Sequence, residues 1–323
     1  MIQNDTRQSM DRREFMTRIS ALAVTSGLTL GATSIKGAAE SNRLKIAMFS
    51  GMFKGLSLRA AMECAGKIGY EGIEIYDNPA LKHLDINCTA EQAAEIKKMA
   101  DDNKVDICVI YTSLGGNVLA GEEQRKKGLD DVAKALDVCD RMSCKMLKVT
   151  AGQLKKSAYK DDEAGIVATW LGGACDRAVK HNIRVVAEIH FGQYCETVAM
   201  ACKIIDLVNR PNFGVIHDAG NLCITGDIYG EDSVKCLGDR IFHVHVKDMV
   251  KAAADDKTAH DYPAGRYKRA LLGEGNVDHR PLFNALKKIG YKGYISCEAS
   301  GGDDPAAVAK HEFDEVCKLL SPA

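Results

Sequence analysis

The sequence predicts an α/β protein folded as a single (β/α)8 TIM barrel. Three observations lead to this prediction: eight short apolar segments have the length of strands, amphipathic segments with helical spacing lie between them, and together they occupy about 280 residues. That length is typical of eight β–α units. The competing fold is a doubly wound open sheet, which would need a Gly-x-Gly-x-x-Gly turn after an early strand, and the chain has none there.

The eight strand candidates are nearly continuous apolar runs, as expected for strands buried on both faces. The seventh carries two histidines, His243 and His245, whose side chains should point the same way because they are two residues apart. The strand candidates are residues 44–50, 72–76, 105–112, 145–150, 183–191, 213–218, 241–247 and 293–298.

Helical segments separate these strands, and several carry recognisable ends. Thr89 is an expected N-cap, and Pro211 ends the helix before the sixth strand. The longest irregular stretch, 248–278, follows the seventh strand, and we expect it to form a functional loop over the barrel mouth. The expected helices include residues 56–68, 90–102, 122–142, 161–181, 196–209 and 280–289.

The N-terminal segment differs in kind from the rest. Arg12 and Arg13 precede an apolar run from about Ile19 to Ala32, and small residues follow. This is the layout of a removable export signal, and the paired arginines resemble the twin-arginine type. We therefore expect residues 1–39 to be a signal peptide for export to the periplasm and residues 40–323 to be the barrel. A charged N-terminal helix, or retention of the run as an anchor, is the alternative.

Composition narrows the classes of partner. The net charge is -1 with 27% charged residues, so the clustered basic excess of a nucleic-acid-binding protein is missing. No later apolar run approaches the 18 residues of a transmembrane helix. The twelve cysteines contain no Cys-x-x-Cys pair, and we expect most of them to be small buried hydrophobic residues. A membrane or nucleic-acid partner of the mature form is not expected, and homo-oligomerisation stays open.

Charged side chains stand at the carboxyl ends of the last four strands. Glu188 lies on the fifth, Asp218 on the sixth, His245 on the seventh and Glu298 on the eighth. Barrel active sites form at this face. The set is rich in oxygen and suits Mn²⁺, Mg²⁺ or Co²⁺ better than a thiolate zinc site would. A solvated strand end explains each residue taken singly, but the four together predict a divalent-metal site.

Four stretches resemble the xylose-isomerase-like barrels, a superfamily that includes sugar phosphate isomerases and epimerases, inosose dehydratase and ketose 3-epimerases. The resemblance covers residues 44–320. It implies that the four strand-end residues ligate the metal, Mn²⁺ first with Mg²⁺, Co²⁺ or Zn²⁺ as alternatives, and that His243 lies deeper and supports the site. The stretches are Ala187-Glu188-Ile189-His190, Asp218-Ala219-Gly220-Asn221, His243-Val244-His245-Val246-Lys247-Asp248 and Leu272-Gly273-Glu274-Gly275-Asn276-Val277-Asp278.

The resemblance also implies a mechanism, proton abstraction beside a carbonyl with the metal stabilising an enediolate. Glu188 and Glu298 would flank the carbon, one removing a proton and the other returning it. For His190 a supporting or core role is the alternative to substrate binding. The expected substrate-binding residues are His190, Lys247, Asn221 and Lys251. Lys148, Thr150 and Glu74 could also line the pocket, and the alternative for each is a solvated rim position or a structural role.

Three positions depart from the ketose 3-epimerase pattern. Those enzymes usually carry His, a carboxylate and Arg where this chain has Asn221, Tyr194 and Lys251. Because these positions bind the substrate there, the changes argue against a free-ketose 3-epimerase and leave the metal chemistry intact. We expect a metal-dependent isomerase or epimerase acting on a sugar or keto-sugar. The alternatives are a lyase acting on an inosose or 3-keto-sugar, an endonuclease IV-like nuclease and a non-catalytic sugar-binding protein.

Overall fold

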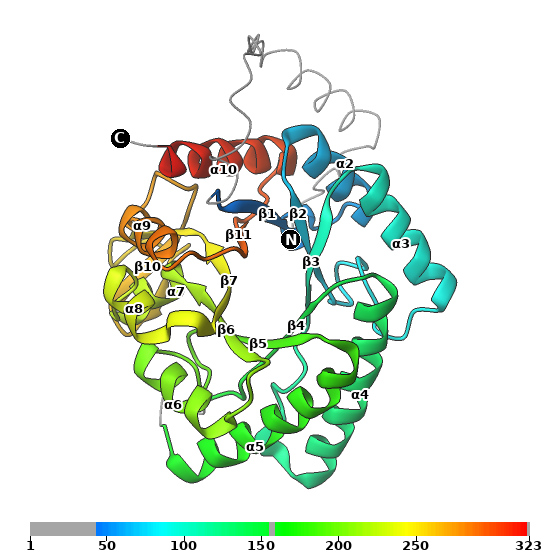
Figure 1. Cartoon of the computed structure of the whole chain (residues 1–323). Helices are drawn as coiled ribbons and strands as arrows, with labels where there is room; N and C mark the ends of the chain where they lie inside the picture. The colour runs from blue at the N-terminus through cyan, green and yellow to red at the C-terminus, as the bar shows by residue number, and fades with distance from the viewer. Residues whose placement is uncertain (1–42, 155–158, 322–323) are drawn as a thin grey trace, which may run out of the picture.

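Eight parallel strands close into a barrel in the computed structural model, which describes residues 43–154 and 159–321 (Figure 1). Their order around the ring is β1-β11-β7-β6-β5-β4-β3-β2, so the last strand of the chain pairs with the first. This confirms the predicted (β/α)8 barrel. The expected export signal lies outside the described residues. The barrel strands are β1 (Lys45–Phe49), β2 (Gly72–Tyr76), β3 (Asp106–Tyr111), β4 (Met146–Val149), β5 (Arg184–Glu188), β6 (Phe213–Asp218), β7 (Ile241–Val246) and β11 (Tyr294–Cys297).

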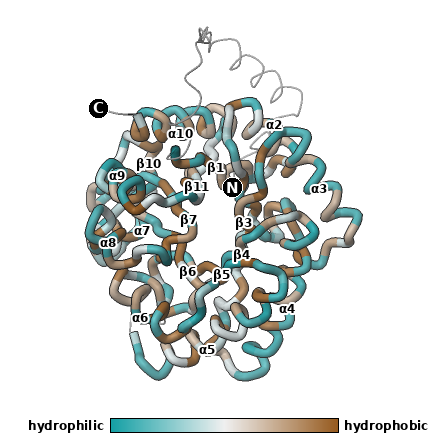
Figure 2. Tube along the Cα trace, in the orientation of Figure 1, coloured by the Kyte–Doolittle hydropathy of each residue, from teal (hydrophilic) through white to brown (hydrophobic). Residues whose placement is uncertain are grey.

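Helices surround the barrel and bury one face each against it (Figure 1). Figure 2 shows hydrophobic stretches along several barrel strands, whereas the outer helices alternate hydrophobic and hydrophilic segments. The predicted cap at Thr89 is confirmed as a reciprocal capping box with Gln92. The helices are α2 (Leu58–Ile68), α3 (Ala90–Asp102), α4 (Glu122–Arg141), α5 (Asp161–Ala178), α6 (Val198–Val208), α7 (Ala219–Thr225), α8 (Glu231–Leu237), α9 (Arg280–Lys288) and α10 (Pro305–Leu320).

The segment after β7 is not the irregular loop that we expected. It forms a three-stranded antiparallel sheet of β8 (Asp248–Lys251), β9 (His260–Tyr262) and β10 (Gly265–Ala270). The prediction was wrong because these strands are short and largely polar, so they lack the apolar runs that marked the barrel strands.

The buried carboxylate of Asp248 binds the backbone of the residues that follow β10. Its two oxygens accept hydrogen bonds of 2.9–3.0 Å from the backbone N–H groups of Met249, Gly273, Gly275 and Val277. A Cβ atom on Gly275 would lie 2.1 Å from Oδ1 of Asp248, so only glycine fits there. The Leu272–Asp278 stretch noted in the sequence is thus a set of backbone donors wrapped around one side chain.

Two further expectations from the sequence concern the cysteines and membrane-spanning helices. The twelve cysteines are unpaired, and seven of them are buried, which agrees with their expected behaviour as small apolar residues. Among the helices within residues 43–154 and 159–321, none has both the length and the apolar character needed to cross a bilayer.

Candidate metal centre

Four charged side chains meet at the carboxyl ends of four neighbouring strands. Glu188 ends β5, Asp218 ends β6, His245 lies one residue before the end of β7, and Glu298 directly follows β11. One potential ligand atom from each lies within 4.8 Å of the others. Asp218 and His245 are fully buried, and the side chain of Glu298 is 15% exposed. The structure therefore brings the predicted set together, and its role as a ligand set remains a prediction.

The first turn of α7 orients two of these carboxylates. Asp218 is the N-cap of the helix, and its Oδ1 accepts a 2.8 Å hydrogen bond from the N–H of Asn221, which leaves Oδ2 for the cluster. The side-chain amide of Asn221 donates to Oε1 of Glu188 at 3.1 Å. Asn221, which we expected to bind substrate, donates hydrogen bonds to two carboxylates of the cluster in this structure.

A fully buried carboxylate, Glu74 on β2, lies beneath the cluster. Its Oε2 lies 3.0 Å from Nε2 of His245 and 3.1 Å from Nε2 of His243. Because an ionised carboxylate only accepts, each ring donates a proton from Nε2. Burial lowers the pKa of His245, but Glu74 and the cluster carboxylates outweigh burial and raise that pKa well above its usual range, so a cation would bind Nδ1 by displacing its proton. Both histidines point inward as expected, with His243 the deeper. Of the two roles that we considered for Glu74, pocket lining and structural support, these contacts favour support.

The other ring nitrogen of His245 is the best indication of an ion. Nδ1 is buried and has no hydrogen-bond partner among the described residues. It lies 3.4 Å from oxygens of Glu188 and Glu298 and 3.7 Å from Oδ2 of Asp218. A buried imidazole nitrogen facing three carboxylate oxygens fits a divalent cation, and the carboxylate behind the imidazole is the usual support of a metal-binding histidine.

Charge within the cluster is strongly perturbed. Burial raises the pKa of Glu74, but His245 and His243 outweigh burial and lower it to about 2. Burial likewise opposes ionisation of Glu188 and Glu298, yet the nearby cations, led by His190 for the first and Arg269 for the second, hold both pKa values well below the usual range. These carboxylates are therefore ionised at neutral pH, as ligands of a divalent cation must be.

Two cations from the chain also contact the carboxylates. Nζ of Lys247 lies 2.7 Å from both Oδ2 of Asp218 and Oε2 of Glu298. Arg269 on β10 donates to Oε1 of Glu298 at 2.8 Å and to its backbone oxygen at 2.5 Å. Lys247, an expected substrate-binding residue, thus contacts the cluster carboxylates directly. Nothing in the sequence indicated Arg269, because β10, the strand that presents it, has no apolar run.

An aromatic wall from the first three strands faces the charged residues. Phe49, Tyr76 and Tyr111 are the last residues of β1, β2 and β3, and their ring centroids lie 5.0–5.4 Å apart. The Tyr111 hydroxyl donates a 2.5 Å hydrogen bond to Oε2 of Glu188, and its ring stacks on His245. These rings were also missed, although an aromatic residue at the end of three successive strands is a signal that could have found them.

One of the remaining candidates, Lys148, lies beside this wall. This buried lysine places Nζ 3.9 Å from the ring centroid of Tyr111 and 3.4 Å from Oγ1 of Thr150, and burial lowers its pKa to about 8. His190 is half-buried, and its Nδ1 lies 2.7 Å from the oxygen of Phe191.

Two other positions lie away from the cluster. Lys251 is exposed on β8, where its backbone N–H donates to Asn276. Tyr194 is buried, and its hydroxyl donates to Glu163 on α5. Neither contacts the four-residue cluster, so a substrate role for Lys251 would need the exposed sheet to take part in binding.

Comparison with known proteins gives the same architecture. A family model described as "Xylose isomerase-like TIM barrel" matches residues 62–319. Inosose dehydratase from Lacticaseibacillus casei is 30% identical over 166 residues, 49% of this chain and 53% of that protein, so the chain matches about half the length of this relative.

Two further comparisons extend over more of the chain. L-ribulose 3-epimerase from Methylomonas sp. (strain DH-1) is 26% identical over 259 residues, 78% of this chain and 82% of that protein. The crystal structure of IOLI protein with a bound zinc atom superimposes with a TM-score of 0.72 at 18% identity, covering 86% of this chain and 98% of that one. At this identity the superposition supports the fold alone.

Proposed function

The chain belongs to the xylose isomerase-like TIM barrel family, and we propose that it is a divalent-metal-dependent enzyme that isomerises or epimerises a sugar or keto-sugar through an enediolate. The observation that carries the proposal is Nδ1 of His245, a buried atom without a hydrogen-bond partner among the described residues that faces three carboxylates. Mn²⁺ is the proposed ion because the set is rich in oxygen. Zinc is the alternative, since the structural neighbour IOLI was solved with it.

Bound by Glu188, Asp218, His245 and Glu298, such an ion would polarise the substrate carbonyl and stabilise negative charge as it develops. In the ring, β6 and β7 lie between β5 and β11, so Glu188 and Glu298 approach from the two ends of the set. This arrangement suits one carboxylate removing a proton beside the carbonyl while the other returns a proton to the opposite face.

The surrounding side chains keep these two carboxylates in place. Glu188 accepts from Tyr111 and Asn221, and Glu298 accepts from Lys247 and Arg269. Each carboxylate thus has donors on both of its oxygens, which restricts its rotation before substrate arrives. The aromatic wall that includes Tyr111 gives an apolar surface for the carbon face of a sugar.

A lyase that dehydrates an inosose or a 3-keto-sugar is the second candidate, because it starts with the same proton abstraction. Relatives named inosose dehydratases favour it. So do the departures from the ketose epimerase pattern at Asn221, Tyr194 and Lys251. Elimination also needs an acid for the departing hydroxyl, and Lys247, whose Nζ lies 2.7 Å from both Asp218 and Glu298, could supply it.

One experiment separates these activities. Keto-sugars and inososes are incubated with the Mn²⁺-loaded protein in D2O and followed by NMR. An epimerase or isomerase incorporates deuterium beside the carbonyl and keeps every hydroxyl, whereas a lyase loses one and forms an unsaturated carbonyl product. Glu298→Gln should abolish either reaction, and Glu315→Gln on α10 is the matched control. Purified protein without a divalent ion, together with full activity of Glu298→Gln, would rule the mechanism out.

We also propose export to the periplasm, on the sequence evidence of Arg12, Arg13 and the apolar run that follows them. Phosphorylated sugars are kept in the cytoplasm, so a periplasmic enzyme would act on free or oxidised glycosides. The double variant Arg12→Lys, Arg13→Lys should leave the protein in the cytoplasmic fraction. Unchanged export of that variant would contradict a twin-arginine signal.

A further inference from the structure

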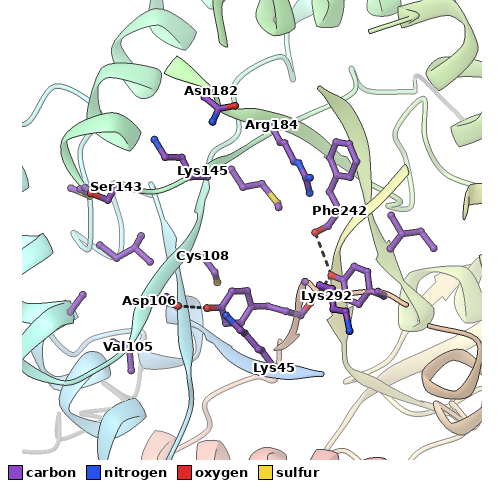
Figure 3. Close-up of a pocket in the computed structure, with 18 of the residues that line it drawn as sticks. Lys45, Val105, Asp106, Cys108, Ser143, Lys145, Asn182, Arg184, Phe242 and Lys292 are labelled. Atoms are coloured by element: carbon purple, nitrogen blue, oxygen red, sulfur yellow. Dashed lines mark hydrogen bonds between the residues drawn. The ribbon is translucent and has the colours of Figure 1, made fainter. Parts of the chain in front are cut away.

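A cavity of about 880 Å³ lies at the amino end of the barrel, at the face opposite the metal centre (Figure 3). The first residues of six barrel strands line it, among them Lys45 of β1, Arg184 of β5 and Tyr294 of β11. Arg184 and Glu188 stand on the same strand four residues apart, which separates the cavity from the cluster by about 13 Å along β5. Its volume is that of a small-molecule binding site.

Two irregularities in the barrel direct side chains into this cavity. Ile73 pairs with Ile107 but Glu74 pairs with Val109, so Cys108 is an extra residue on β3. In the same way, Val215 pairs with Ile241 and Ile216 with His243, so Phe242 is an extra residue on β7. Both extra residues line the cavity. Bulges between parallel strands are rare and commonly serve to re-aim a side chain.

The positions of these residues around the ring are regular. β3 and β7 stand four places apart in a ring of eight, so Cys108 and Phe242 come from opposite sides. β1 and β5 also stand four places apart, so Lys45 and Arg184 form a second opposed pair. Figure 3 shows these four side chains around the opening. The amino end of the barrel thus presents an apolar floor between two opposed cations.

The two cations are held over aromatic rings instead of being neutralised. Nζ of Lys45 lies 5.1 Å from the ring centroid of Tyr294, and the guanidinium of Arg184 lies 4.5 Å from that of Phe242. Within residues 43–154 and 159–321, neither cation pairs with a carboxylate. A guanidinium stacked by its face keeps its N–H edge available for an oxyanion.

The acidic residues of the cavity have partners of their own. Asp106 accepts a 2.5 Å hydrogen bond from the hydroxyl of Tyr294, and Asp101 pairs with Lys97 at 2.5 Å. Asp239 lies 3.8 Å from Arg240. Against these three carboxylates, the described residues that line the cavity include five cationic side chains, namely Lys45, Lys97, Lys145, Arg184 and Lys292. The net charge of the lining is therefore positive.

We propose that this cavity binds a small organic dianion, with one carboxylate or phosphate group at Lys45, the other at Arg184, and a carbon chain lying on Cys108 and Met146. If each end of the ligand carries one oxyanion that pairs with one cation, the placement of Lys45 and Arg184 on opposite strands is explained. The apolar floor explains why the ligand has a carbon body. This site is separate from the metal centre and does not rest on the function proposed for it.

The test is calorimetric titration of the metal-loaded protein with glutarate, propane-1,3-bisphosphate and butyrate. Glutarate carries two charges and the bisphosphate about three to four, since each phosphate monoester holds about 1.5 to 2. At least one of these two ligands should bind more tightly than butyrate, which carries a single charge. Arg184→Ala and Lys45→Ala should each weaken that binding by about tenfold or more, and added salt should weaken it further. The control variant is Lys126→Ala, Arg280→Ala, which removes two exposed cations elsewhere.

Two comparisons make the outcome decisive. Binding that persists after the metal is stripped, and in Glu298→Gln, belongs to the amino-end cavity, whereas binding lost in both is chelation at the metal centre and overturns the proposal. Equal affinity for dianions and butyrate overturns it too, as do dianion affinities unchanged by Arg184→Ala and Lys45→Ala. A preference for the bisphosphate over glutarate, or the reverse, identifies the natural oxyanion.

Discussion

Oε2 of Glu74 on β2 lies 3.0 Å from Nε2 of His245 on β7, in a contact across the barrel interior. This hydrogen bond fixes Nε2 as a donor and so turns Nδ1 toward the cluster carboxylates. A neutral partner would weaken the bond and lower the basicity of the ring. The affinity of the site for a metal should therefore depend on a residue that cannot itself touch the ion.

We predict that Glu74→Gln lowers affinity for Mn²⁺ by about 10- to 100-fold, because the support behind the ligand histidine becomes neutral. Competition with a chromogenic chelator measures the change, and circular dichroism checks that the barrel remains folded. Glu95→Gln, on the exposed side of α3, should bind the metal as the unmodified protein does. Equal affinity in Glu74→Gln would mean that His245 is not a ligand.

Arg269 gives a second prediction, since it is the link between the three-stranded sheet and the cluster. Its guanidinium contacts both the side chain and the backbone oxygen of Glu298. Arg269→Lys keeps the charge but loses the two-pronged contact, so we expect the rate of deuterium incorporation to fall by about 100-fold while metal affinity changes little. Arg266→Lys on the same strand should keep the full rate. If metal affinity falls while the rate of the metal-loaded enzyme is kept, Arg269 supports metal binding by Glu298 and not the proton transfer.

The sequence allowed the barrel and the four-residue cluster to be predicted because both depend on local signals. Apolar runs mark strands that are buried on both faces, and a charged residue at the end of such a run is conspicuous, as at Glu188 and Asp218. These signals needed no knowledge of which strands pair. The order of strands in the ring then followed from the fold class alone.

The residues that support the cluster were harder to find for a physical reason. Glu74 acts on His245 from a strand 171 positions away in the chain, and nothing near Glu74 in the sequence indicates that contact. Arg269 depends on the pairing of two short strands, β8 and β10, in which it lies opposite Met249 and which β9 separates in the chain. Contacts that arise from tertiary structure between polar residues leave no periodic signal.

Asp248 supports a prediction about the segment that follows β10. Asp248→Asn would replace one accepting oxygen with an N–H₂ group that faces backbone donors, so the N–H groups of Gly273, Gly275 and Val277 lose part of their shared acceptor. We expect a loss of about 1–3 kcal/mol in local stability. Hydrogen exchange should show faster exchange at these amides while β5 and β6 keep their protection. Unchanged exchange at these amides would contradict the role given to Asp248.

The last prediction concerns pH and rests on Glu312 of α10. Its side chain is fully buried, Oε1 accepts a 2.9 Å hydrogen bond from the N–H of Leu272, and Oε2 has no partner among the described residues. Burial raises the pKa of this carboxyl to about 7, against an ordinary value of 4.5. The folded chain thus holds a proton that the unfolded chain has released over this interval, so the stabilising effect of that proton is complete below pH 4.5 and is lost as the pH rises through 7.

Glu312→Gln keeps an acceptor for Leu272 and cannot titrate, so it isolates this effect. The unfolding free energy of the unmodified protein, relative to Glu312→Gln, should fall between pH 4.5 and 7 with a slope of at most about 1.4 kcal/mol per pH unit, then level off. Urea unfolding at matched pH values, with the metal removed from both proteins, measures the difference. The unfolding free energy of the unmodified protein relative to Glu315→Gln, a variant on the same helix that keeps Glu312, should show no such slope. A difference that stays constant across the interval would mean that Glu312 is ionised inside the folded protein, in which case a cation must approach Oε2.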